Sequence, residues 1–168
     1  LPVAFLSGDA ADRRLHDRPA SVLARLEVDD QAGVLADAFW EPSFLRGLLE
    51  TIVRHRRLRG TVGEVAASTT RALRGLVGDD PTVLEPSPVK AEQTNTSAVF
   101  GDRLILKLYR KCEPGPNPEL EIGWYLSERA YFPHVPAVAG ALYYGERDHE
   151  TSALALLQEY IRGGEDTW

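Results

Sequence analysis

The chain has 168 residues, of which 43% are hydrophobic and 26% are charged, with a formal net charge of −6. This composition is typical of a soluble globular protein with room for one ordinary domain or two small ones. The negative charge argues against nucleic-acid binding, which depends on a basic surface. The single cysteine, Cys112, excludes an internal disulfide framework and fits a reducing compartment. No apolar run approaches the roughly 20 residues that span a bilayer, and the N-terminus lacks a signal-peptide pattern, so we expect a cytoplasmic protein.

The first part of the chain predicts two strands and a helix. Apolar and polar residues alternate over 20–28 and again over 32–40, which favours strands. Within 41–60, pairs of apolar residues recur every four positions, with Pro42 near the start and Gly60 just past the end. This pattern predicts an amphipathic helix.

The basic stretch "RHRRLRG" (54–60) is interpreted as the C-terminal end of that helix, where positive charge complements the helix dipole. Residues 62–76 resemble a strand more than a helix. Three prolines within 78–90 mark a boundary. We therefore predict a cap subdomain over 1–86 and a second subdomain over 87–168.

The second subdomain begins with a predicted hairpin and helix. "SAVF" and "RLILKLY" are separated by Gly101-Asp102, a pair that favours a tight turn between antiparallel strands. Asn117 followed by Pro118 predicts the start of a helix that runs to about Arg129. Two further strands, "AVAGALYYG" and "ALALLQEYI", complete the order β-β-β-α-β-β. The expected fold class is α+β.

Lys107 lies in the middle of the segment "RLILKLY". The two-residue period of a strand places Leu104, Leu106 and Leu108 on one face and Ile105, Lys107 and Tyr109 on the other. An ordinary exposed lysine on a half-solvated strand would explain this pattern. Glu121, in the first turn of the next helix, could pair with Lys107. The preceding "QTNTS" carries hydroxyl and amide groups that could bind phosphate oxygens.

A hairpin, a lysine, a helix glutamate and a hinge-like Gly163-Gly164, in that order, resemble the N-terminal lobe of the protein-kinase-like fold. The segments "KAEQTNTSAVFGDRLILKLYRK", "PGPNPELEIGWYLSE", "FPHVPAVAGAL" and "LLQEYIRGGEDTW" resemble bacterial maltokinases, above all those fused behind a trehalose synthase. The segment "RLHDRPASVLARLEVDDQAGVLADAFWEPSFLRGLLETI" is similar to the cap subdomain of those proteins. The resemblance covers nearly the whole chain.

The resemblance implies an ATP-dependent kinase that phosphorylates maltose at its anomeric hydroxyl, giving maltose 1-phosphate for α-glucan synthesis. ATP, maltose and a fused or associated trehalose synthase are the partners that it implies, with no nucleic acid and no membrane. By position, it assigns phosphate contacts to Gln93, Asn95, Thr96 and Ser97, the ATP lysine to Lys107, and its helix partner to Glu121.

The same resemblance places Ile105 against the adenine and Gln158 at the gatekeeper position. Glu159 would offer a backbone carbonyl, and Ile161 a backbone N–H, to the adenine. The chain departs from the protein-kinase glycine-rich loop because no glycine lies between Gln93 and Phe100. This departure favours the small-molecule kinase branch.

Catalytic and metal-binding residues of such kinases come from a C-terminal lobe. No H-x-D or D-F-G-like motif follows the hinge, and "LHDR" (15–18), which precedes the lysine, is interpreted as a surface loop. We expect no catalytic residue and no metal site in this chain, with the Mg²⁺ ligands in a missing lobe and no activity of the chain alone. A kinase of another sugar or aminosugar, such as glucosamine, and a non-catalytic binding module remain alternatives.

Overall fold

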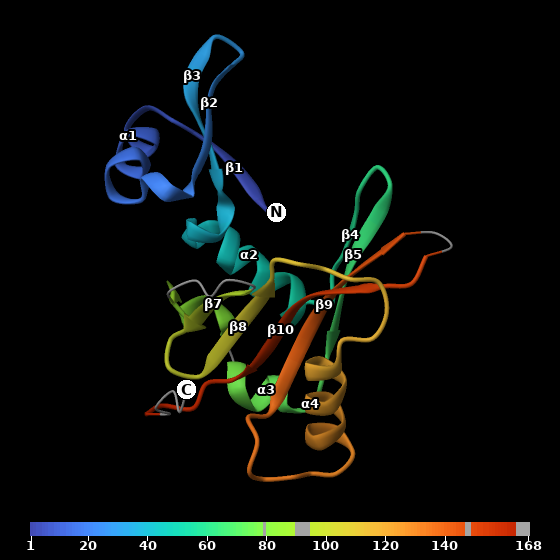
Figure 1. The fold of residues 1–168 in the computed structure, drawn as a ribbon. Coiled ribbons are helices and arrows are strands. Elements are labelled where there is room, and N and C mark those ends of the chain that lie inside the picture. The colour runs from blue at the N-terminus through green and yellow to red at the C-terminus, as the bar shows by residue number, and fades with distance from the viewer. Residues whose placement is uncertain (79, 90–94, 147–148, 164–168) are drawn as a thin grey trace. The chain divides into compact units, whose positions relative to one another are not determined.

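The computed structural model describes residues 1–78, 80–89, 95–146 and 149–163 (Figure 1). Within them the chain is α+β with antiparallel sheets, as the sequence predicts. It divides into two compact units, Leu1–Leu45 and Arg46–Trp168. The predicted boundary between residues 86 and 87 lies inside the second unit, because strands from both sides of it pair in one sheet.

The N-terminal unit contains one helix and a three-stranded sheet. Its elements are β1 (Val3–Ser7), α1 (Gly8–Asp17), β2 (Val22–Val28) and β3 (Gln31–Asp37), with 3-10 helices η1 (Pro19–Ser21) and η2 (Ala38–Trp40). The strand order is β1-β3-β2, and both pairings are antiparallel. The turn residues Asp29 and Asp30 have φ angles of 49° and 61°, as a two-residue hairpin turn requires. Strands within the two predicted segments are confirmed.

Helix α1 includes Leu15, His16 and Asp17, so the interpretation of "LHDR" as a loop is wrong for these three residues. The helix is held in place by Arg14, which is only 8% exposed. Its guanidinium donates to the hydroxyl of Ser21 and to the carbonyl oxygen of Asp37, each at 3.2 Å, and pairs with the carboxylate of Glu41. A buried guanidinium needs such partners because it has five donors and no acceptor.

The second unit is built around a seven-stranded sheet. Its elements are α2 (Pro42–Val53, beginning in the first unit), β4 (Arg57–Arg59), β5 (Gly63–Thr69), α3 (Ala72–Val77), η3 (Pro81–Val83), β6 (Pro86–Pro88), β7 (Asn95–Phe100), β8 (Leu104–Tyr109), α4 (Pro118–Glu128), β9 (Val138–Glu146) and β10 (Ser152–Glu159). The strand order is β4-β5-β9-β10-β8-β7-β6, and every pairing is antiparallel. From β6 to β10 the elements follow the predicted order β-β-β-α-β-β.

Helix α2 ends earlier than predicted, and the stretch expected to be its basic end contains strand β4 instead. His55 adopts a φ of 50°, its N–H donates to the carbonyl of Ile52, and the N–H of Arg56 donates to the carbonyl of Thr51. These two bonds form a Schellman-type helix end. Since glycine is the usual residue at this position, His55 gave no signal in the sequence.

The two faces of the large sheet are covered by different helices. Leu104, Leu106 and Leu108 are all buried. The strand register puts Gly140 of β9 on the same face of the sheet as these leucines. A Cβ at Gly140 would lie 2.7 Å from Ile52, so α2 packs on this face. On the other face, α4 packs through Leu120 and Trp124 against Tyr109 and residues of β9 and β10 (Figure 1).

Candidate functional site

Lys107 lies in the middle of β8, on the face of the sheet that α4 covers. In register it stands opposite Ser97 of β7 and Leu156 of β10. Its side chain is 27% exposed, whereas Leu106 and Leu108 on the opposite face are buried in the core. The lysine is therefore a half-buried charge beside a helix and not one on a freely solvated strand face.

The ammonium of Lys107 is held by a carboxylate from the first turn of α4. Lys107 Nζ donates to one oxygen of Glu119 at 2.9 Å, and the hydroxyl of Tyr109 donates to the other oxygen at 3.1 Å. Tyr109 is only 8% exposed. Burial, followed by the negative charge of Glu119, raises the pKa of the Tyr109 hydroxyl well above its ordinary value. The tyrosine therefore stays a donor near neutral pH.

The structure pairs Lys107 with Glu119 and not with the predicted Glu121. Residues two apart on an α-helix point about 200° apart around its axis, so the two carboxylates lie on different sides of α4. Glu121 lines a hollow of about 460 Å³ together with Tyr143 and Glu150. Burial raises the pKa of Tyr143, and the charge of Glu121 contributes.

The prediction missed Glu119 and Tyr109, although the sequence contained a signal for each of them. Glu119 and Glu121 are both acids in the first turn of α4, where the helix dipole favours them. Tyr109 follows Lys107 by two residues and so shares its face of the strand. Choosing between the two acids requires the rotation of the helix against the sheet, which local sequence does not specify.

The predicted phosphate-binding residues divide between the two faces of the sheet. Asn95 and Ser97 stand opposite Tyr109 and Lys107 in register and therefore share the face of the lysine. Thr96 is 1% exposed on the leucine face, where its hydroxyl accepts a bond from Arg110 Nε at 2.6 Å. Its hydroxyl therefore lies across the sheet from the lysine. Gln93 lies outside the described residues.

Ile105 and Gln158, two of the residues predicted to surround the adenine, lie along the same face as Lys107. Gln158 stands opposite Ile105, which in turn stands opposite Val99. These three residues form a mostly apolar surface next to the lysine. The side chain of Ile161 is 53% exposed, beyond the end of β10.

The end of β10 is anchored at two points. The backbone N–H of Glu159 donates to the carbonyl of Ala137 at 2.8 Å, and that of Tyr160 donates to the carbonyl of Arg103 at 2.9 Å. Arg162 pairs with Asp102 in the turn between β7 and β8. The contacts of Tyr160 and Arg162 tie the start of the predicted hinge to the hairpin that carries Lys107. The contacts predicted for the Glu159 carbonyl and the Ile161 N–H stay predictions.

At this site the ammonium of Lys107 lies beside the hydroxyl of Ser97 and the amide of Asn95. An apolar surface around Ile105 adjoins them. Such a combination can bind a phosphorylated ligand with an apolar ring. Among the residues that the structure describes, no group of three or more His, Cys, Asp or Glu side chains could hold a metal ion. No helix within these residues is long and apolar enough to cross a membrane.

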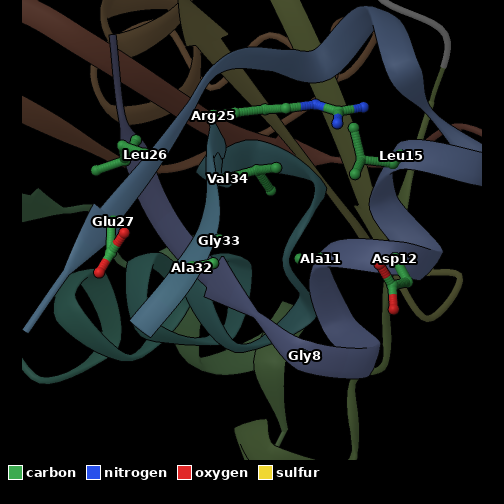
Figure 2. Close-up of a pocket in the computed structure, with 10 residues that line it drawn as sticks. All are labelled: Gly8, Ala11, Asp12, Leu15, Arg25, Leu26, Glu27, Ala32, Gly33 and Val34. Atoms are coloured by element: carbon green, nitrogen blue, oxygen red, sulfur yellow. The ribbon is translucent and has the colours of Figure 1, made fainter. Parts of the chain in front are cut away.

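A second hollow, of about 570 Å³, lies in the N-terminal unit between α1 and the β2–β3 hairpin. Figure 2 shows Arg25 extending from β2 towards Leu15 of α1, while Glu27 and Asp12 lie on opposite sides of the hollow. Its floor includes Val34, which is buried. None of the described residues that were predicted to bind a nucleotide lines this hollow.

No known protein-family model matches the chain.

Proposed function

We propose that the second unit binds ATP and serves as the nucleotide-binding lobe of a sugar kinase. The resemblance to maltokinases makes maltose the proposed acceptor and maltose 1-phosphate the proposed product, which feeds α-glucan synthesis. A cytoplasmic location and a fused or associated trehalose synthase belong to the same proposal.

The observation that carries the proposal is the Lys107–Glu119 pair. A lysine in the middle of a sheet strand, held at 2.9 Å by a carboxylate from the adjacent helix, is arranged to present its ammonium in one direction. A fixed ammonium is suited to phosphate oxygens because charge-assisted hydrogen bonds are stronger than neutral ones. The order of the elements around it, β-β-β-α-β-β, agrees with the lobe that the resemblance implies.

The neighbouring residues supply the other parts of a nucleotide site. Ser97 and Asn95 would donate to phosphate oxygens from the strand beside Lys107. Ile105 and Gln158 would contact the adenine farther along the same face. When bound, Mg²⁺ supplies charge neutralisation at the phosphates. The proposal assigns its ligands and the catalytic base to a C-terminal lobe, so this chain by itself would bind ATP weakly and transfer no phosphoryl group.

Binding of ATP to the 168-residue chain tests the proposal. NMR titration should show saturable shifts at β7 and β8 amides as ATP rises to millimolar concentration. Lys107→Ala should weaken this binding about tenfold, because it removes a charge-assisted contact. Lys111→Ala is the matched control, since Lys111 is 78% exposed and pairs with Glu113, two residues away in the chain.

An unchanged ATP affinity in Lys107→Ala, or no saturable binding by the unaltered chain, would overturn the proposal and favour a non-catalytic binding module. In a protein that also contains the catalytic lobe, Lys107→Ala should raise the KM for ATP and lower kcat while sugar affinity changes little. A panel of sugars and aminosugars assayed with ATP would separate maltose from the alternative acceptors.

A further inference from the structure

The carboxylate of Glu119 is held at both of its oxygens by two neighbouring side chains of β8. Lys107 donates to Oε1 at 2.9 Å, and Tyr109 donates to Oε2 at 3.1 Å. The two donors are two residues apart on the strand and therefore project from the same face. A carboxylate with both oxygens engaged has little freedom to rotate, although Glu119 is 45% exposed.

Tyr109 is the more firmly placed of the two donors. Its ring is buried in the cluster that joins the sheet to α4, with Leu120, Leu156 and the partly buried Trp124 as neighbours. Its hydroxyl is therefore fixed by packing, whereas the ammonium of Lys107 is carried on a flexible four-carbon stem. The hydroxyl donates to the Glu119 carboxylate, so the buried ring determines where that carboxylate lies.

We propose that Tyr109 is a positioning residue of the nucleotide site: its hydroxyl holds Glu119, and Glu119 in turn holds Lys107 towards the phosphates. The inference rests on the proposed function, because it assigns the orientation of the ATP lysine. It makes Glu119, and not Glu121, the carboxylate that orients the lysine.

The surroundings of Glu121 support this choice. Glu121 faces Tyr143 and lines the same hollow as Glu150. Glu121 could take the place of Glu119 beside Lys107 only if the first turn of α4 rotated about the helix axis. That turn is fixed by its cap, because the Asn117 side chain accepts from the N–H of Leu120 at 3.1 Å. Losing the Tyr109 hydroxyl should therefore leave Lys107 less well oriented, because Glu121 is not placed to substitute for Glu119.

The test compares ATP with adenosine in the same variants, each by NMR titration of the 168-residue chain. Tyr109→Phe keeps the buried ring, and Glu119→Gln keeps the side-chain shape. Both should weaken ATP binding, by about threefold and about tenfold, because an ammonium that is no longer held gains less from binding phosphate. Adenosine, which carries no phosphate, should bind each variant as it binds the unaltered chain.

Matched controls exist for both changes. Tyr144 donates to Glu146 at 2.8 Å within β9, and Glu113 pairs with Lys111 at 2.6 Å in an exposed segment. Tyr144→Phe, Glu113→Gln and Glu121→Gln should each change ATP affinity less than twofold. The double variant Tyr109→Phe/Glu119→Gln should bind ATP no more weakly than Glu119→Gln alone, since the tyrosine acts through the glutamate.

Three results would overturn the inference while leaving the proposed function intact: ATP binding that depends on Lys107 but not on Tyr109, a larger loss from Glu121→Gln than from Glu119→Gln, or additive losses in the double variant. Equal losses of adenosine and ATP in Tyr109→Phe would show a structural role and also overturn it. Failure of the unaltered chain to bind ATP would instead overturn the proposed function, and the inference with it.

Discussion

Lys107 Nζ lies 2.9 Å from a carboxylate oxygen of Glu119, and the second oxygen of the same carboxylate accepts the hydroxyl of Tyr109. This relationship joins the middle of a core strand to the first turn of α4, the helix that packs on that face of the sheet. It gives Lys107 a defined orientation, and it is the feature on which the proposed nucleotide site depends.

Thr96 and Ser97 are adjacent in sequence but should have opposite effects when substituted. Thr96→Val removes the buried hydroxyl that accepts from Arg110, so it should lower the free energy of unfolding by about 1–2 kcal/mol and leave ATP affinity unchanged. Ser97→Ala, on the lysine face, should weaken ATP binding and alter stability by less than about 0.5 kcal/mol. Urea unfolding and NMR titration of both variants check this. The reverse pattern would place the phosphate contacts on the leucine face.

The high pKa of Tyr109 predicts a loss of stability in alkaline solution. In the unfolded chain a tyrosine loses its proton near pH 10, whereas burial and the charge of Glu119 keep the folded hydroxyl protonated to higher pH. The unfolded state therefore releases a proton that the folded state retains, and the free energy of unfolding should fall as pH rises above about 10.

Urea unfolding between pH 8 and pH 11, with phenolate absorbance of the folded protein, measures this effect. Tyr109→Phe should show a shallower decline than the unaltered chain. Tyr143, whose pKa is also raised, should account for part of the decline that remains. The same pH dependence with and without the Tyr109 hydroxyl would contradict the prediction.

Asn117 should stabilise the start of α4. Its side chain accepts from the N–H of Leu120 at 3.1 Å, as an N-cap does. Asn117→Ala should lower the free energy of unfolding by about 1 kcal/mol, whereas Asn117→Asp keeps an acceptor and should cost little. Urea unfolding of the two variants checks the prediction, and equal losses would exclude the capping bond as the cause.

Arg14 should be a main determinant of stability in the N-terminal unit. Its guanidinium is 8% exposed and joins α1 to Ser21, to the end of β3 and to Glu41. Arg14→Ala should destabilise this unit by about 2–3 kcal/mol, because it leaves several polar partners without their donor. Hydrogen exchange of β3 amides measures the effect. Exposed Arg13 is the control, and Arg13→Ala should leave exchange unchanged.

Much of the fold followed from local patterns in the sequence. The alternation around Lys107 placed three leucines in the core, and Asn117-Pro118 marked the first residue of α4. These predictions succeeded because side-chain periodicity and helix capping depend on residues that are close in the chain. The end of α2 was missed because His55 adopts a positive φ there, a conformation in which glycine is the usual residue.

The sequence by itself determined the strands from β7 to β10, the hairpin and the strand face on which Lys107 lies. Only the tertiary structure decided that β4 and β5 join the same sheet as β8, that the Thr96 hydroxyl lies across the sheet from the lysine, and that Glu119 holds it. Each of these depends on strand register or on the rotation of a helix against the sheet. Both are set by packing between residues far apart in the chain, and no local pattern records them.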